Sequence, residues 1–215
     1  MKFIPWFLSI LAFLYTGCGV TQPVRAIPRD ETRLNASLGG PVIPLGDAAV
    51  VVPYLNLGVQ HGVTDDLTVF GNAHVTALLF KDAGLDAGTT VRVREQQEWL
   101  PEINAKGQIY AWYLMRSGRV RVLPLATVTA GYSTGDRSYL YIGADNAFQF
   151  TSSRHYFIAP LAGYSFGISK AMTMQVETKW LAPNIDTRHG IFEGATSIDG
   201  RGNIGIYFGL ELSLK

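Results

Sequence analysis

Residues 203–214, at the end of the chain, alternate between apolar and polar side chains with a period of two. The apolar positions are Ile204, Ile206, Phe208, Leu210, Leu212 and Leu214. The opposite positions carry glycines, Tyr207 and Glu211. This period predicts a β-strand, because successive side chains of an extended chain point to opposite faces. One face of the strand is therefore expected to meet an apolar medium and the other a polar one.

The same alternation recurs after residue 31 and predicts ten strands. They cover 32–44, 49–63, 67–80, 85–94, 103–115, 119–132, 138–150, 155–168, 172–181 and 203–214. Residues 182–202 form the longest connection, and an even strand number places it on the side opposite the chain ends. The pattern predicts an all-β fold, a single antiparallel up-and-down barrel of about ten strands over residues 32–215.

Two features of the pattern need an explanation from the structure. Pro53, Pro124 and Pro160 fall inside predicted strands, although proline cannot donate a ladder hydrogen bond. We expect them at bulges or strand ends. The connection 95–102 is also longer than a typical turn between barrel strands.

Composition distinguishes a membrane barrel from a soluble one. Charged residues make up 16% of the chain and aromatic residues 12%, whereas ordinary domains carry about 25% charge. A soluble β-sandwich or lipocalin-like barrel would also alternate, with its apolar faces inward. The polar faces here hold mostly Gly, Thr, Asn and Tyr, and soluble surfaces normally carry more charge. We therefore predict a transmembrane barrel with lipid outside and a polar lumen.

The first residues predict export from the cytoplasm. Lys2 precedes an apolar run at 3–15, which is typical of a secretory signal peptide over residues 1–17. The following Thr16-Gly17-Cys18 resembles the lipobox of bacterial lipoproteins, although Tyr15 stands where that pattern has Leu. The resemblance implies a lipidated Cys18.

A second processing site remains open. Cleavage after Ala26 would follow Val24-Arg25-Ala26 and would discard Cys18 with the signal peptide. With lipidation, residues 18–31 are expected to form a short polar tether ahead of the barrel.

Charged side chains on the polar faces predict a network in the lumen. The inward set comprises Arg33, Asp86, Arg92, Arg94, Lys106, Arg121, Asp145, Glu177, Lys179 and Glu211. A barrel of ten strands is narrow, so these charges are expected to meet and pair across it. One interpretation is a structural polar plug, and the other is a small pore or ligand niche lined by arginines.

Two local groupings bear on catalysis at the outer rim. A lipid-modifying hydrolase needs a His close to a Ser or Asp. His155 lies near Ser152 and Ser153, and His189 near Asp186. Neither spacing is specific, and a His in a polar loop is more often a solvated surface residue. A non-enzymatic barrel is therefore preferred, with an acyl hydrolase as an alternative.

Other chemistry has no signature in the sequence. The four histidines share no metal-ligand spacing, and the glycines are scattered singly instead of forming a phosphate-binding loop. A net charge of +1 indicates no nucleic-acid partner. We predict no metal and no cofactor. The expected partners are membrane lipid and an envelope protein that contacts loop 182–202.

The whole layout resembles uncharacterised bacterial outer-membrane β-barrel lipoproteins. The features that carry this resemblance are Gly17-Cys18, the polar tether, and the tight hairpins at 62–67 and 167–172. The resemblance implies a place in the outer membrane of a Gram-negative cell envelope and brings no activity. The sequence thus predicts a non-enzymatic envelope barrel with a structural or surface-interaction role, and a narrow pore or a hydrolase as alternatives.

Overall fold

The computed structural model describes residues 20–45, 48–150, 155–186 and 197–214. Within these ranges the strands are β1 (Thr32–Leu45), β2 (Ala48–Val51), β3 (Tyr54–Thr64), β4 (Leu67–His74), β5 (Asp82–Arg94), β6 (Glu102–Leu114), β7 (Arg119–Gly135), β8 (Ser138–Phe148), β9 (Tyr156–Gly167), β10 (Met172–Asp186) and β11 (Arg201–Leu214). One short helix, α2 (Val75–Leu79), follows β4. Among the described residues, no helix has the length and apolar character that a bilayer-spanning helix requires.

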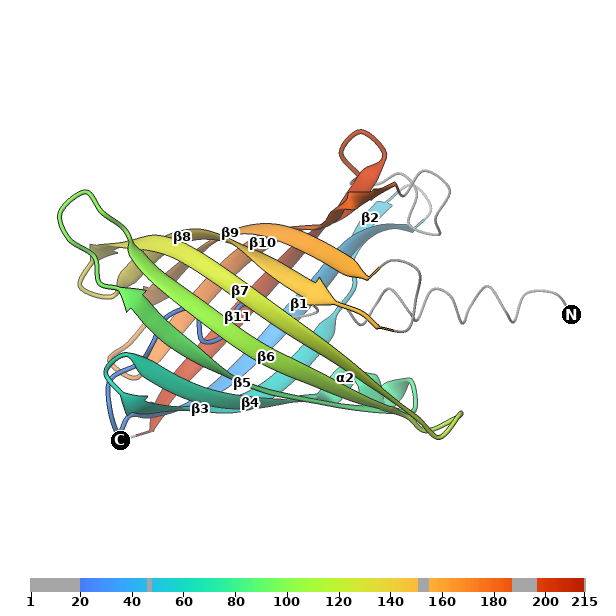
Figure 1. Ribbon diagram of the computed structural model, residues 1–215, viewed down its shortest axis with the longest axis horizontal. Coiled ribbons are helices and arrows are strands. Elements are labelled where there is room, and N and C mark those ends of the chain that lie inside the picture. The colour runs from blue at the N-terminus through green and yellow to red at the C-terminus, as the bar shows by residue number, and fades with distance from the viewer. Residues whose placement is uncertain (1–19, 46–47, 151–154, 187–196, 215) are drawn as a thin grey trace, which may run out of the picture.

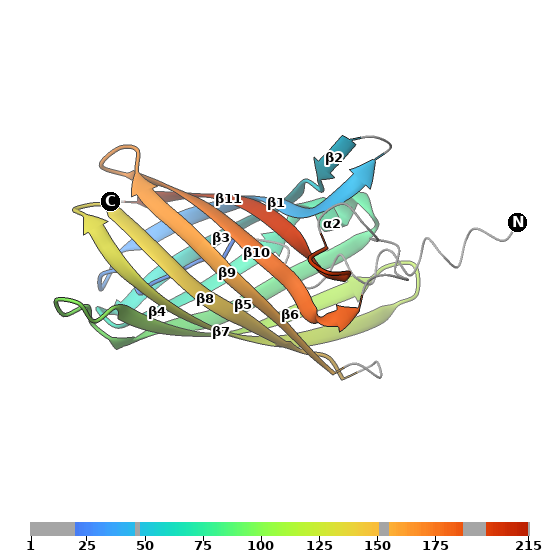
Figure 2. The ribbon, with the colours of Figure 1, turned by 90° about the horizontal axis from the view of Figure 1, so that it is seen from above.

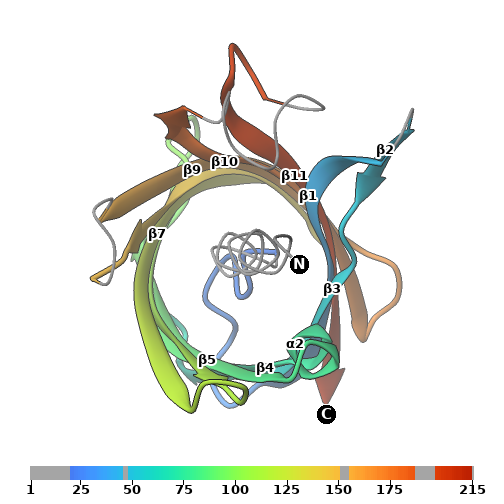
Figure 3. The ribbon, with the colours of Figure 1, turned by 90° about the vertical axis from the view of Figure 1, so that its right-hand side faces the viewer.

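The strands close into an antiparallel barrel (Figures 1 and 2). From β3 to β11 each strand pairs with the next one in the chain. β1 pairs with β3 on one side and with β11 on the other, from Thr32 opposite Leu214 to Pro41 opposite Gly205. The recorded pairing of β2 is with the end of β1 alone, so ten of the eleven described strands make the ring seen end-on in Figure 3. The predicted ten-stranded up-and-down barrel is confirmed.

The two ends of the barrel differ. The near end, on the left in Figure 1, carries the start of β1, the end of β11 and the short turns β3–β4, β7–β8 and β9–β10. The far end carries β2, α2 and the β10–β11 connection. The long connection therefore lies opposite the start of β1 and the end of β11, as strand parity predicts.

The wall is apolar outside and polar inside. Leu85 and Ile142 are 61% and 64% exposed on the outer surface, while Gln60 and Glu177 are 0% and 1% exposed in the lumen. A soluble barrel has the opposite arrangement, because water would not tolerate the outer leucines in such number. This surface is that of a transmembrane barrel, whose outer side chains lie in lipid.

The third predicted strand, 67–80, is wrong in its last part. β4 ends at His74, and Val75–Leu79 form α2. The Thr76 hydroxyl accepts a hydrogen bond from the Leu55 amide at 2.8 Å, which fixes the helix against the start of β3. Ala77 is 2% exposed and packs into the lumen. Over five residues, apolar spacing does not distinguish a helical turn from a strand.

The three prolines have different places in the wall. Pro53 lies between β2 and β3, so it marks a strand end as expected. Pro124 lies within β7 opposite Ile109, and Pro160 within β9 opposite Ala144. These two prolines therefore belong to the ladder itself.

The long connection 95–101 folds back on itself at the near end. Gln97 and Leu100 exchange two backbone hydrogen bonds, of 3.1 and 2.7 Å, around a left-handed Glu98. The Tyr132 hydroxyl donates to the Trp99 carbonyl oxygen, which attaches the connection to β7. The Trp99 side chain is 76% exposed, and tryptophan at this level of a barrel suits the membrane–water interface. The connection 95–101 is therefore long because it forms a small hairpin of its own.

The predicted loop 182–202 is shorter than expected. β10 continues to Asp186, and β11 already begins at Arg201. The left-handed Ala182 lies at a register shift between Leu181 and Asp186, so the strand passes a bulge and then continues. Residues 187–196 are outside the described part of the chain.

Candidate functional site in the lumen

Residues 20–31 are here called the lumenal segment; residues 20–27 lie inside the near half of the barrel, and the exposed residues 28–30 lead on to β1. Figure 3 shows the start of the described chain, in blue, within the ring of strands. Thr21 and Ile27 are only 1% and 2% exposed. This corrects the expected free tether at 18–31 for the residues that the structure describes, since a tether would be solvated. The predicted signal peptide 1–17 and Cys18 lie outside the described residues.

Side chains of the wall satisfy the main chain of the lumenal segment. Three wall groups donate to its carbonyl oxygens: Gln175 Nε2 to Thr21 at 3.1 Å, Thr90 Oγ1 to Pro23 at 3.2 Å and Thr129 Oγ1 to Val24 at 3.2 Å. Three wall groups accept from its amides: Glu177 Oε1 from Thr21 at 2.9 Å, Asn104 Oδ1 from Ala26 at 3.4 Å and Thr68 Oγ1 from Ile27 at 2.8 Å. Buried backbone groups need such partners where no ladder supplies them. The segment is therefore bound along its length by five strands.

One charged side chain of the segment is also bound. Arg25 Nη2 lies 2.9 Å from Glu102 Oε2, and its Nη1 donates to Ser133 Oγ at 3.3 Å. Its guanidinium carbon stands 4.8 Å from the centre of the Tyr139 ring. Asn104 Nδ2 donates to the other oxygen of Glu102 at 2.8 Å. The wall thus offers Arg25 a carboxylate, a hydroxyl and an aromatic face.

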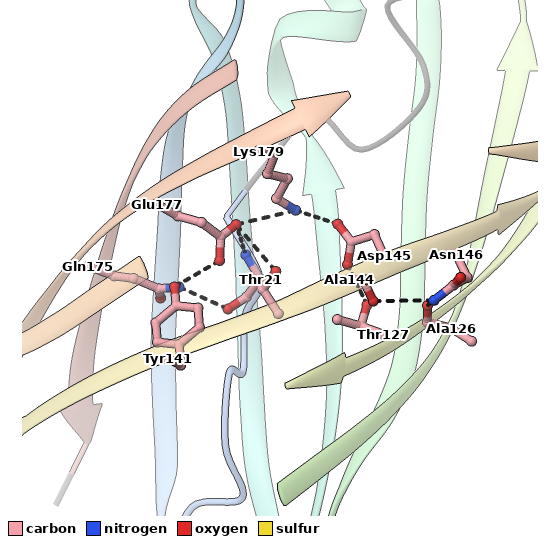
Figure 4. Close-up of polar contacts among 10 residues, drawn as sticks. All are labelled: Thr21, Ala126, Thr127, Tyr141, Ala144, Asp145, Asn146, Gln175, Glu177 and Lys179. Atoms are coloured by element: carbon pink, nitrogen blue, oxygen red, sulfur yellow. Dashed lines mark hydrogen bonds and ion pairs between the residues drawn. The ribbon is translucent and has the colours of Figure 1, made fainter. Parts of the chain in front are cut away.

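A buried charge cluster lies deeper in the lumen, around Lys179 (Figure 4). Its ammonium group is 2.6 Å from Asp145 Oδ2 and 3.3 Å from Glu177 Oε1. The Tyr141 hydroxyl donates to Glu177 Oε2 at 2.8 Å. Lys106 is 8% exposed, with its ammonium group 5.8 Å from the centre of the Phe70 ring. Paired charges with satisfied lone pairs are the form in which ions are buried.

A second buried pair lies toward the far end. His74 Nε2 is 2.8 Å from Asp86 Oδ2, and both side chains are at most 2% exposed. Asn72 Nδ2 and Gln108 Nε2 each donate to the other Asp86 oxygen at 2.6 Å. The His74 ring centre is 4.4 Å from that of Trp112. Aromatic and aliphatic side chains complete this part of the lumen: Tyr54, Tyr110, Leu123, Leu125 and Ala147.

The remaining charges of the predicted network lie near the rims. Arg33 pairs with Glu31 at 2.8 Å and with Glu211 at 2.9 Å. Arg92 pairs with Asp66 of the β3–β4 turn at 2.6 Å. The predicted set is therefore divided into several local pairs.

Two arginines of the set have no carboxylate partner recorded in the described chain. Arg94 donates to the Pro101 carbonyl oxygen at 3.2 and 3.1 Å. Arg121 is exposed near the far end of β7 and opposite Trp112. The structure does not bring these two into the charge clusters.

The two histidine groupings fall mostly outside the described residues. Ser152, Ser153 and His189 are not described, nor is the side chain of Asp186. His155 is exposed, and its Nδ1 lies 2.9 Å from the Gln149 carbonyl oxygen. Within the described ranges, no three His, Cys, Asp or Glu side chains gather as a metal site.

A cavity of about 510 Å³ opens at the near end beside the lumenal segment. Its walls include the segment itself, at Val24, Arg25, Ala26, Ile27 and Pro28. Turn residues such as Asp65, Asp136 and Lys170 and the hydroxyl groups of Ser138 and Ser165 complete it. One side of the lumenal segment therefore borders the cavity at the near end of the barrel.

The sequence pattern missed the segment and most of the polar partners in the lumen. Tyr141, Gln175 and His74 occupy inward positions, so alternation places them in the lumen without naming their partners. No pattern within the segment indicates that it lies in the lumen, because the side chains that bind it lie on five separate strands.

Comparison with known proteins shows the fold. The chain matches no protein-family model and no curated protein. An outer membrane channel from Pseudomonas putida F1 aligns with 90% of this chain and 98% of that chain, at 8% identity and a TM-score of 0.51. The translocator domain of the autotransporter NalP from Neisseria meningitidis aligns over 97% and 93%, at 8% identity and a TM-score of 0.45. At this identity the first similarity shows the β-barrel fold alone. No comparison supports the lipoprotein part of the sequence resemblance.

Proposed function

We propose that this chain is a non-enzymatic outer-membrane barrel of a Gram-negative envelope, closed by its own lumenal segment. It acts as a structural element or through its surface loops. The observation that carries the proposal is the set of six hydrogen bonds between the wall and the main chain of residues 21–27. A segment bound in this way obstructs the near half of the lumen, beside the cavity that opens at the near end.

The outer-membrane location draws support from the wall. Its exposed side chains form an apolar surface, while charged pairs are enclosed in the lumen. The barrel fold shared with the Pseudomonas putida channel agrees with this location. Contact of an envelope protein with the region 182–202 stays part of the proposal.

The absence of an enzymatic role is likewise proposed. Among the described residues, His74 and Asp86 form an imidazole–carboxylate pair of the kind that can transfer protons, but the pair is buried among aromatic rings. A substrate would have to displace Trp112 or Tyr110 to reach it. The pair is therefore better suited to holding the strands of the wall together near the far end than to acid–base chemistry.

A narrow pore is the second candidate. The cavity of about 510 Å³ at the near end and the fold shared with an outer membrane channel favour it. In this candidate the lumenal segment is a removable closure, and the charged wall behind it lines the path.

Conductance distinguishes the two candidates. The full-length chain, inserted in planar bilayers, is expected to show no stepwise current, because the lumenal segment occupies the near half of the barrel. Insertion is checked by heat-modifiable gel migration of the same sample. The matched variant lacks residues 20–26 and is expected to conduct. Stepwise current through the full-length chain at the same density would favour the pore.

Processing of the N-terminus gives a second test. Thr21 is held in the lumen by Glu177, and three residues span about 10 Å at most. Glu177 lies inside β10, so a barrel closed in this way keeps Thr21 within the lumen. We therefore do not carry the lipidated Cys18 into the proposal. Gly17-Cys18-Gly19 also has the small-x-small form of an ordinary signal-peptidase site, which would leave Val20 first.

The expected mass of the mature protein is that of a chain beginning at Val20 without acyl groups. Palmitate labelling of the wild-type protein is then expected to equal that of Cys18→Ala. A mature chain that begins at Ile27 would remove the closure and refute the closed barrel. A palmitate label that Cys18→Ala abolishes would instead show that the segment leaves the lumen.

A further inference from the structure

We propose that the near half of the lumen is a binding site for an arginine-containing peptide, occupied in this structure by the chain's own residues 20–26. The closed barrel requires only that the segment be present. The inference goes beyond it, because it states that the wall recognises this peptide without the covalent link to β1.

The recognition is directed at the peptide backbone. Six wall side chains bind amides or carbonyl oxygens over seven residues of the segment. At Thr21 both main-chain groups are bound, the amide by Glu177 and the carbonyl by Gln175. Contacts of this kind select the backbone conformation of the peptide, here one that bends at residues 22–25, and tolerate many side chains.

The wall also makes room for a peptide at two glycines. A Cβ atom at Gly62 would stand 2.0 Å from the Pro28 carbonyl oxygen. A Cβ atom at Gly209 would stand 2.8 Å from both Gln22 Nε2 and Val20 Cγ2. At Gly62 the nearest atom is a backbone oxygen, so only glycine lets Pro28 lie so close to the wall; at Gly209 the nearest atoms are side-chain ends, for which glycine leaves room. The lumen is thus shaped for the segment as well as polar enough to bind it.

Arg25 is the residue of the segment whose side chain the wall recognises. Its guanidinium group meets Glu102, Ser133 and the Tyr139 ring at once. Glu102 is 2% exposed, so its carboxylate would be left largely unpaired by a peptide without a cation at this position. The expected ligand is therefore a peptide that follows the same bent path and carries arginine four positions after the residue bound by Glu177.

The site does not depend on the segment for its own construction. The barrel ladder begins at Thr32, so removal of residues 20–26 breaks no strand pairing. Glu177 keeps Lys179 and Tyr141, and Glu102 keeps Asn104. The near-end cavity reaches Val24 and Ile27, so a peptide has a route of entry.

The test cuts the segment free in the folded barrel. Pro28, Arg29 and Asp30 are exposed, so a protease recognition site can replace them without entering the lumen. The full-length chain carries a fluorophore upstream of Val20 and is cut after refolding in detergent. The label is expected to stay with the barrel on gel filtration and to leave when excess unlabelled peptide Val-Thr-Gln-Pro-Val-Arg-Ala is added.

Matched variants identify the contacts. Arg25→Ala in the segment, or Glu102→Gln in the wall, is expected to speed release about tenfold or more, as for loss of a charged hydrogen bond. A scrambled peptide of the same composition is expected not to displace the label. Arg116→Ala serves as the control, because this arginine is exposed in the turn between β6 and β7, at the far end of the barrel.

Three outcomes would overturn the inference: immediate release of the cut segment, equal displacement by the scrambled peptide, or equal release from Arg25→Ala and wild type. The barrel folds before the cut, so a folding failure of a truncated chain cannot obscure the result. Conductance of the uncut chain tests the closed barrel separately, and either result can fail without the other.

Discussion

Replacing Ile142 with arginine is expected to lower the free energy of unfolding in lipid vesicles by about 2–4 kcal/mol. Ile142 lies in the middle of β8 and is 64% exposed on the outer wall, opposite Ala130 and Ala162. A guanidinium at this depth would have to lie in hydrocarbon, where neither lipid nor neighbouring side chains can solvate it. In a soluble protein the same exposed substitution would change stability by about 0.5 kcal/mol or less.

Val120→Arg is the matched control. Val120 is 65% exposed, like Ile142, but it lies at the far end of β7, next to Arg119 and Arg121. At the membrane–water interface the expected loss is about 0–1 kcal/mol. Urea titration in vesicles, followed by tryptophan fluorescence, measures both variants. Equal small effects at the two positions would contradict the transmembrane arrangement.

The inside and outside of the wall could be predicted from the sequence because alternation is a local property. Tyr207 is 0% exposed and Phe208 is 43% exposed, as the pattern in 203–214 predicts. The same rule places Glu177 and Lys179 in the lumen. Each strand carries its own signal, so the number and order of the strands follow as well.

Partners across the lumen could not be predicted, because they depend on register and on closure of the ring. Thr21 and Glu177 are 156 positions apart, and nothing near either residue indicates the other. His74 and Asp86 both point inward by alternation, yet their contact requires the β4–β5 register that pairs Asn72 with Asp86. Polar composition alone cannot tell a tether in water from a segment bound by a polar lumen.

The largest loss is expected from Lys179→Met, which removes the cation between two buried carboxylates. Lys179 is 3% exposed, and Asp145 and Glu177 lie 2.6 and 3.3 Å from its ammonium group. Without it, the two carboxylates face each other in a confined lumen, and a broken buried pair typically costs about 3–5 kcal/mol. The free energy of unfolding of the full-length chain in vesicles measures the effect.

The double variant Lys179→Met/Asp145→Leu shows whether the loss of stability comes from the missing ion-pair attraction or from a carboxylate that is left buried without a cation. Replacing a buried ion pair by apolar side chains is often nearly neutral, so the second substitution is expected to restore most of the loss. Arg92→Ala is the control at the near rim, where its partner Asp66 has a side chain that is 63% exposed. An exposed pair contributes about 1 kcal/mol or less. If Lys179→Met cost no more than Arg92→Ala, water would reach the cluster, and the lumen would be open at the depth of Glu177.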